Sequence, residues 1–454
     1  MLKTNHSHEK FIAGRRSFMV GALAAGAVGL TSCTDPQVVR VNPVSSPTPG
    51  ATPVATPDNL LPPMPPYLAK TYPANYKNAV LASDEIVNHF AKSFDTPSAL
   101  IHAVRGYGKN FKRADGSNAT DFLCGRFAEE KNVNGTNFVR FTRSNVEVHE
   151  NSFLKTFIEA GVSPDQAITV NGKKYTLKDL GEHAKSLFRL DPNNLTKFEK
   201  DYTQEHLPWG LIAFSNLLPG GKGSWVNAYG EKIELLDVID KSLAEFEGVC
   251  QSVKSALDKH EEISDGFHKA IKPYACYGNH AVYGFLSCLK NGYTDRGLKE
   301  RIPALLNLTI YRLAKQTDNI EREYAEELAN VKADTSPQFA QMNKKLAGAG
   351  VSIDETFEMV KLRAIIKLTG HILEAVNFAK LNKMFTPTPE QQKYLQTGEQ
   401  KLIESIVKMR ALNLEGLKNF EPKPVGEVVI GLGHASRALK LLTPENPDKN
   451  PKSI

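Results

Sequence analysis

The sequence predicts a mainly α-helical body, because apolar residues recur at the spacing of a helix and few segments alternate like strands. From Leu235 to Val249 the apolar side chains follow the 3.6-residue period that places them on one helix face. Pairs such as Asn291-Gly292 and Ser336-Pro337 separate the periodic segments, and such pairs end helices. We therefore expect helices over residues 233–257, 281–290, 296–331, 353–381, 389–412 and 426–442.

One segment of the N-terminal half predicts a β-hairpin. Residues 168–170 and 174–176 flank Asn171-Gly172, a pair that favours a tight hairpin turn. Thr176 is followed three residues later by Asp179, so a helix with a capped start is expected from there to about Leu190. We interpret residues 110–176 as a small β-containing insertion in the helical body.

Residues 1–33 have the three zones of an export signal. Arg15 and Arg16 precede an apolar core over residues 18–30, and small residues then lead to Cys33. The core is too short to span a bilayer, which takes about 20 apolar residues. The arginine pair followed by Ser17-Phe18 resembles the twin-arginine export signal, and Leu30-Thr31-Ser32-Cys33 resembles the lipobox of bacterial lipoproteins.

This resemblance implies export by the twin-arginine machinery and a membrane anchor of palmitate-type lipid on Cys33. The mature chain would then lie in the cell envelope and face the periplasm, and Thr34 after the cysteine favours the outer membrane in a diderm. Gly14 and Val20 depart from the twin-arginine pattern, so an ordinary secreted lipoprotein is the alternative. Twin-arginine substrates cross the membrane folded, so such a protein either folds too fast for unfolded export or acquires a cofactor, a metal or an organic group, in the cytoplasm.

Four parts are expected along the chain: the signal over 1–33, a Pro/Thr/Ser-rich tether over 34–67, a helical globular domain over 68–445 and a flexible tail over 446–454. The formal charge of +6 falls when the signal leaves, so nucleic acid is not an expected partner. No Cys-x-x-Cys-His motif occurs, which argues against c-type haem. Cysteines that could form two disulfides in an oxidising compartment are Cys124, Cys250, Cys276 and Cys288.

A short pattern built on histidine recurs along the chain. Each copy has a histidine, an apolar residue, two variable residues, a small residue and another apolar residue. Glycine or asparagine precedes three of the histidines, so we expect these histidines in the first turns of helices. The small residue one turn later would let another helix approach closely. The copies begin at His102, His206, His280, His371 and His434, and His183 begins a partial copy.

Helices that begin in the same way resemble the inner helices of α/α-toroid folds, and no single family is matched. The resemblance implies a helical-hairpin array over about residues 101–442, with a functional site in the funnel at one end. We therefore expect the side chains of His206, His280, His371 and His434 to converge, with Trp209 or Tyr283 on the cavity wall. The alternative is that these histidines only pack between helices.

Cys276 and His280 are candidates for a metal site. On a helix they would lie four residues apart on one face, and a thiolate with an imidazole suits zinc. His434 or His206 would complete the site. The alternative is a buried, inert cysteine beside a structural histidine.

Other candidate residues suit ligand binding and acid–base chemistry. Glu205 and Glu374 belong to the histidine pattern and could orient an imidazole or act as a general acid. The aromatic candidates for a flat ligand such as a sugar ring are Trp209, Trp225, Tyr277 and Tyr283.

The sequence therefore predicts that the chain is a binding or structural protein of the cell envelope. The chain has no Gly-x-Ser-x-Gly elbow and no His-Glu-x-x-His helix, which disfavours serine hydrolases and the common zinc peptidases. The alternative is an α/α-toroid enzyme that acts on an envelope polysaccharide, with metal assistance and with the four converging histidines as its catalytic candidates.

Overall fold

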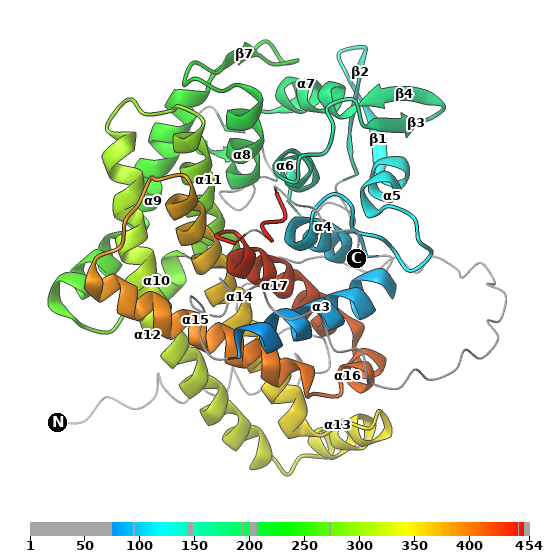
Figure 1. The fold of residues 1–454 in the computed structure, drawn as a ribbon, viewed down its shortest axis with the longest axis vertical. Helices are drawn as coiled ribbons and strands as arrows, with labels where there is room; N and C mark the ends of the chain where they lie inside the picture. The colour runs from blue at the N-terminus through cyan, green and yellow to red at the C-terminus, as the bar shows by residue number, and fades with distance from the viewer. Residues whose placement is uncertain are drawn as a thin grey trace.

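The computed structural model describes residues 75–93, 96–142, 149–191, 194–198, 207–271, 274–443 and 445–448. Within these residues the protein is mainly α-helical, as the periodicity predicts, with small two-stranded hairpins gathered at one end (Figure 1). The helices are α3 (Tyr76–Ser93), α4 (Pro97–Tyr107), α5 (Ala119–Arg126), α6 (Ser152–Glu159), α7 (Leu177–Leu187), α8 (Leu207–Leu217), α9 (Leu235–Lys259), α10 (Asp265–Ala270), a 3₁₀ turn η1 (Ala275–Gly278), α11 (Asn279–Lys290), α12 (Leu298–Lys332), α13 (Pro337–Gly348), α14 (Ile353–Leu381), α15 (Pro389–Arg410), α16 (Leu414–Phe420) and α17 (Pro422–Lys440).

The long helices of the C-terminal half lie where the apolar period places them. The ends of α9, α12, α14 and α15 differ from the predicted ends by at most two residues. Ser352 and Thr388 begin α14 and α15 with capping boxes, in which side chain and backbone satisfy each other's hydrogen bonds. The sequence interpretation missed α13. Ser336 follows α12 and also caps the start of α13, because its hydroxyl oxygen accepts a hydrogen bond from the Phe339 amide at 3.2 Å.

The predicted hairpin is confirmed. Strands β3 (Ala167–Val170) and β4 (Lys173–Thr176) pair antiparallel, with Ile168 opposite Tyr175. Asn171 and Gly172 have φ angles of 51° and 77°, the positive values that a tight hairpin turn requires. Thr176 and Asp179 form the expected capping box of α7, which ends at Leu187.

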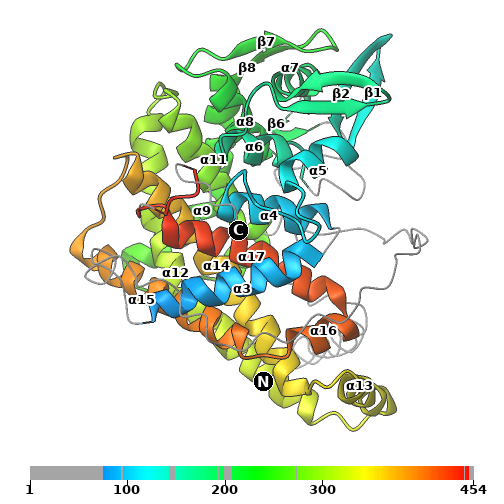
Figure 2. The same ribbon diagram turned by 45° about the vertical axis from the view of Figure 1, so that its right-hand side comes forward.

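Further hairpins were not predicted, because their strands are short and carry many polar residues. β1 (Ala128–Val133) pairs with β2 (Thr136–Phe141) inside the expected insertion. β5 (Leu190–Asp191) with β6 (Asn194–Phe198), and β7 (Ser224–Val226) with β8 (Lys232–Glu234), lie beyond it. In Figure 2 most of these strands gather with α5 and α7 at the end of the molecule opposite α13.

Six helices meet in the interior of the molecule. Helix α4 packs on α17, α17 on α14, α14 on α11, α11 on α8, α8 on α6, and α6 on α4. Figure 1 shows these six helices grouped together, with α3, α12 and α15 beside them. Four of the six carry a histidine of the repeated pattern, so the packing brings segments that are far apart in sequence to one place.

Small residues set the closest of these helix contacts. A Cβ atom on Gly106 would lie 2.8 Å from the carbonyl oxygen of Gly433, and one on Gly370 would lie 3.1 Å from Ala435. A Cβ atom on Gly284 would lie 3.2 Å from the Pro208 carbonyl oxygen. Because a Cβ atom would crowd the neighbouring backbone at each position, glycine allows the backbones to meet, as predicted for Gly106 and Gly284, the small residues of the pattern.

The expectation that the histidines open their helices is wrong in most copies. Among the copies that the structure describes, only His280 lies in a first turn, that of α11, whereas His371 and His434 lie well inside α14 and α17. Gly370 and Gly433, which were interpreted as helix starts, are instead points of contact between helices.

None of the described helices is both long enough and apolar enough to cross a lipid bilayer. The export signal with Arg15 and Arg16, the lipidation candidate Cys33 and the tether lie outside the described residues. Within the stretch expected to be a tail, Asn446 is buried and the carboxylate of Asp448 accepts a hydrogen bond from Arg437 at 2.6 Å.

Candidate functional site

Three of the four histidines expected to converge do so. The rings of His371 and His434 stack with their centres 3.7 Å apart, and the ring of His280 lies 4.8 Å from that of His371 and 5.1 Å from that of His434. All three side chains are buried. The fourth, His206, lies outside the described residues together with Glu205. His102 joins the group at 5.1 Å from His434.

Hydrogen bonds fix the tautomers of three of these imidazoles. Nδ1 of His102 lies 2.6 Å from the Ser98 carbonyl oxygen, and Nδ1 of His371 lies 2.5 Å from the Lys367 carbonyl oxygen. Nδ1 of His434 lies 2.7 Å from the Glu374 carboxylate. Because these oxygens accept, each Nδ1 carries the hydrogen. A neutral ring then keeps a lone pair on Nε2, the arrangement found in metal-binding histidines.

Burial keeps the imidazoles neutral. Burial, with the neighbouring His371, lowers the pKa of both His280 and His434 well below the usual histidine value. The charge of Arg105 acts in the same direction on both rings. Nε2 of His434 is buried and has no hydrogen-bond partner among the described residues. A buried polar atom without a partner is costly, and a bound ligand would remove that cost.

Cys276 reaches the histidines from a turn of unusual backbone conformation. Cys276, Tyr277 and Gly278 follow one another with φ angles of 51°, 60° and 74°. Non-glycine residues in this left-handed region cost about 1–3 kcal/mol each and gather at functional sites. A Cβ atom on Gly278 would lie 2.7 Å from Ile271, so only glycine fits there.

Arg312 of α12 holds this turn from the other side. Its guanidinium donates to the Tyr277 carbonyl oxygen at 2.6 Å and to the Gln316 side chain at 3.0 Å. The side chain is fully buried, and its hydrogen bonds within the described part of the chain go to these two groups. Burial lowers the pKa of Arg312 to about 10. A buried cation that satisfies a backbone carbonyl rather than a carboxylate indicates that the position of this turn is important.

Cys276, His280 and His371 form a group that fits a metal ion. One ligand atom from each lies within 4.8 Å of the others, and all three residues are buried. Nε2 of His280 and Nε2 of His371 are 3.2 Å apart. Two nitrogens bound to zinc at a tetrahedral angle would be about 3.3 Å apart. The predicted pair Cys276 and His280 therefore does lie together, although the 3₁₀ turn replaces the expected helix.

A buried network of charges lies behind the histidines. Glu374 contacts Arg105 at 2.6 Å, Arg105 contacts Glu159 at 2.5 Å, and Lys155 contacts Glu159 at 2.9 Å. The Tyr283 hydroxyl donates to Glu159 at 2.7 Å. Arg437 donates to the Tyr283 oxygen at 3.2 Å and pairs with Asp448 at 2.6 Å, which connects the network to the C-terminal segment.

Burial and neighbouring charges act in opposite directions on the ionisable groups of the network. Burial alone would raise the pKa of Glu159, but the charges of Arg105 and Lys155 outweigh burial and hold that pKa well below the usual range. Burial, followed by the charge of Arg105, lowers the pKa of Lys155 to about 8. Burial raises the pKa of Asp448 at the outer end.

Sequence reasoning missed most of this network, although the histidine pattern contained the signal. The residue three positions after the histidine is Arg105, Tyr283, Glu374 or Arg437 in four copies, and Trp209 in the copy that begins at His206. Residues three apart share a helix face. Of these, Glu374, Tyr283 and Trp209 were predicted as site residues, whereas the two arginines, with Lys155 and Glu159 of α6, were not.

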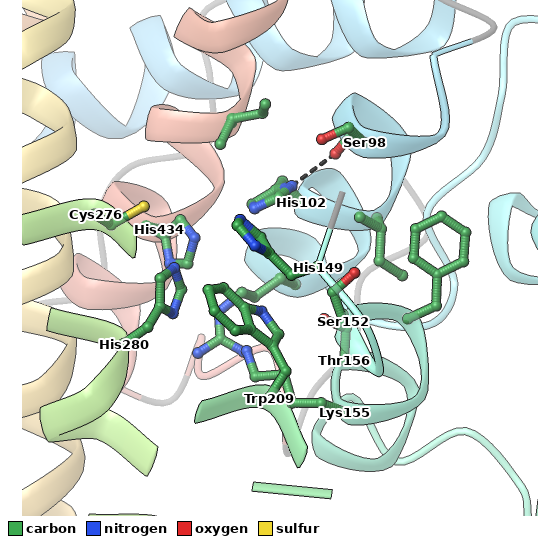
Figure 3. A pocket seen from close by; sticks show the side chains of 14 residues that line it. Ser98, His102, His149, Ser152, Lys155, Thr156, Trp209, Cys276, His280 and His434 are labelled. Atoms are coloured by element: carbon green, nitrogen blue, oxygen red, sulfur yellow. Dashed lines mark hydrogen bonds between the residues drawn. The ribbon is translucent and has the colours of Figure 1, made fainter. Parts of the chain in front are cut away.

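A cavity of about 30 Å³ is lined by His280 and His434 of the histidine group and by Arg105 and Lys155 of the network, whereas His371 and Tyr283 are not among its lining residues. Trp209 lies on its wall, stacked on His149 at 4.0 Å and 4.3 Å from His280. His149 was interpreted only as part of a helix start, so its place at the cavity is a new finding. Figure 3 shows Cys276, His280 and His434 on one side, Ser152, Thr156 and Lys155 on the other, and Trp209 with His149 between them.

Other candidates lie elsewhere. Trp225 of β7 donates to the Lys185 carbonyl oxygen at 2.8 Å and packs against Phe188 and Phe214, which is a structural role. His183 accepts the Val139 amide at 2.8 Å on α7. Tyr277 contributes its carbonyl oxygen to the Arg312 contact and is not among the residues that line the cavity.

The two disulfides considered from the sequence are not formed. The described cysteines Cys124, Cys250, Cys276 and Cys288 are all buried, and none of them forms a disulfide with another. Burial raises the pKa of Cys124 and Cys288 to about 12 and that of Cys250 to about 11, so these three thiols are chemically inert in the folded protein.

No protein-family model, curated protein or solved structure matches this chain. The functional interpretation therefore rests on the geometry of the site.

Proposed function

We propose that this protein binds one transition-metal ion, with zinc as the first candidate, through Cys276, His280 and His371. The observation that carries the proposal is the buried group of one thiol and two imidazoles whose ligand atoms lie within 4.8 Å of one another. Thiolate and imidazole together select zinc or copper rather than magnesium or calcium. The left-handed turn at Cys276 supports the proposal independently, because backbone strain gathers at functional sites.

His434 gives this centre a group that can exchange protons. The Glu374 carboxylate accepts the hydrogen on Nδ1 of His434, so the lone pair of this imidazole is on Nε2. His434 is also one of the residues that line the cavity. A carboxylate-oriented imidazole beside a metal ion is the arrangement of a general base that activates a bound water. Metal-assisted chemistry on a small molecule is therefore the second candidate function, and a metal-binding or structural role without turnover is the first.

The size of the cavity favours an ion and a small ligand over a saccharide. Pockets for organic ligands measure about 300–1,000 Å³, whereas this cavity measures about 30 Å³. The geometry therefore gives no support at this position to the envelope-polysaccharide enzyme considered from the sequence.

The setting of the centre is also proposed. The paired arginines and the lipobox of the first 33 residues support a lipid-anchored protein of the cell envelope, exported in the folded state. Export after folding would let the metal enter in the cytoplasm. The contacts of α4, α17, α14, α11, α8 and α6 around the cavity support an α/α-toroid arrangement, which an experimental structure that includes residues 199–206 would test.

Cobalt substitution tests the proposed metal site. Untagged full-length protein should bind one equivalent of Co²⁺ and develop a sulfur-to-cobalt charge-transfer band. Cys276→Ser should lose the band, and His371→Ala should weaken cobalt binding. Cys124→Ser, which changes a buried thiol outside the group, serves as the matched control and should keep both properties. Cobalt binding without the sulfur band, or no stoichiometric binding, would overturn the proposal.

A further inference from the structure

The cavity lies beside the proposed metal centre and, at about 30 Å³, is too small for large molecules. Cys276 and His280 both belong to the metal group and to the cavity wall, so an ion held by them would be in contact with the cavity. A water molecule needs about 10–15 Å³ of such space, so the cavity holds roughly two waters or a ligand of similar size. Three protein ligands leave a fourth coordination position for such a molecule.

Charge decides which small molecule suits the site. The buried network has three cations, Arg105, Lys155 and Arg437, and three carboxylates, Glu159, Glu374 and Asp448, so it is neutral when all are ionised. A divalent ion bound to one thiolate would add one net positive charge, and an uncompensated charge in a buried site is costly.

Two residues that carry hydrogen-bond donors line the same cavity. Arg105 and Lys155 both line the cavity, and both side chains are almost fully buried. Nε of Arg105 has no hydrogen-bond partner among the described residues. The Lys155 ammonium has three hydrogens and forms an ion pair with Glu159. These cationic donors are complementary to a ligand that carries negative charge.

We propose that the cavity binds a monoanion of at most three non-hydrogen atoms, as the exogenous ligand of the metal ion. The inference rests on the proposed metal site and names its ligand class. Hydroxide, hydroperoxide, azide and cyanate belong to this class. One end of the anion binds the metal, and the other end accepts hydrogen bonds from Arg105 and Lys155.

Anion titration of the cobalt-loaded full-length protein tests the proposal. Azide and cyanate, each of three atoms, should shift the visible cobalt spectrum with saturation, whereas benzoate, a larger monoanion, should leave it unchanged. No shift with azide would overturn the proposal. A shift with benzoate at similar concentrations would also overturn it, because the metal would then be open to bulk solvent.

A pair of variants tests the role of the Lys155 ammonium group in anion binding. With cobalt at saturation, Lys155→Met should weaken azide binding at least about tenfold, because one charge-assisted hydrogen bond is lost. Lys254→Met is the matched control, since Lys254 also pairs with a carboxylate four residues later but lies on the surface of α9. Equal azide affinity in the two variants would contradict the assigned contact.

The two proposals can fail separately. If the sulfur-to-cobalt band is absent from the wild-type protein, the metal site is wrong and the anion site falls with it. If the band is present and azide does not alter the cobalt spectrum, only the anion site is wrong. The size series needs no variant, so a Lys155→Met protein that does not fold leaves the test intact.

Discussion

Substitution of Gly433 tests the helix contact that brings the site together. The pattern places this glycine next to His434, where α17 crosses α4. A Cβ atom there would lie 2.4 Å from the carbonyl oxygen of His102, and one on the opposite glycine, Gly106, would lie 2.8 Å from the carbonyl oxygen of Gly433. Because the overlap is with backbone, no side-chain rotation can relieve it, and the two helices must separate.

The size of the effect follows from two opposing terms. Overpacking a buried contact costs about 1–3 kcal/mol and more when backbone must move. Replacing glycine by alanine inside a helix raises the free energy of unfolding by about 1 kcal/mol, because alanine has the higher helix propensity. Gly433→Ala should therefore lower the free energy of unfolding by about 2 kcal/mol. Gly426→Ala in the same helix meets no atom within 4 Å and should raise it by about 0.5–1 kcal/mol.

Urea unfolding of the metal-free variants, followed by far-ultraviolet circular dichroism, measures the difference. Gly433→Ala should unfold at a lower urea concentration than wild type, and Gly426→Ala at the same or a higher one. Equal midpoints for the two variants would refute the close crossing of α4 and α17, and with it the reason why His102 lies beside His434.

Three further predictions concern the site. Glu374→Gln should lower the free energy of unfolding in urea by about 3–5 kcal/mol, because a buried cation, Arg105, loses one of its carboxylate partners. The control Glu85→Gln removes a carboxylate from an exposed ion pair and should lower it by less than about 1 kcal/mol. Arg312→Met should weaken both cobalt binding and the sulfur-to-cobalt band by releasing the turn of Cys276; an unchanged band would remove its positioning role. Metal-free protein should lose stability as the pH falls below about 6.5, because the unfolded chain then protonates histidines that burial keeps neutral in the folded protein, notably His280 and His434. Stability that is constant between pH 7.5 and 5.5 would contradict those lowered pKa values.

Local patterns predicted the fold better than the site. The periods behind α14 and α15 are properties of contiguous residues, and so is the capping box at Thr176. α13 was missed because Ser336-Pro337 ends one helix and begins the next, and the sequence alone does not separate these roles.

Part of the site could be predicted because the histidine pattern records helix packing. The convergence of His280, His371 and His434 follows from small residues that allow close contact. The place of those histidines within their helices could not be predicted, since a glycine that meets a neighbouring backbone resembles one that begins a helix. Arg105 and Lys155 resemble surface charges in sequence, and only tertiary packing reveals that they are buried.

X-ray absorption at the metal edge of the loaded wild-type protein tests the proposed centre most directly. A site of Cys276, His280 and His371 predicts one sulfur neighbour at about 2.3 Å and two or more nitrogen neighbours at about 2.0–2.1 Å, with the multiple scattering typical of imidazole. A shell of oxygen and nitrogen alone, without sulfur, would contradict the assignment of the metal to this buried group.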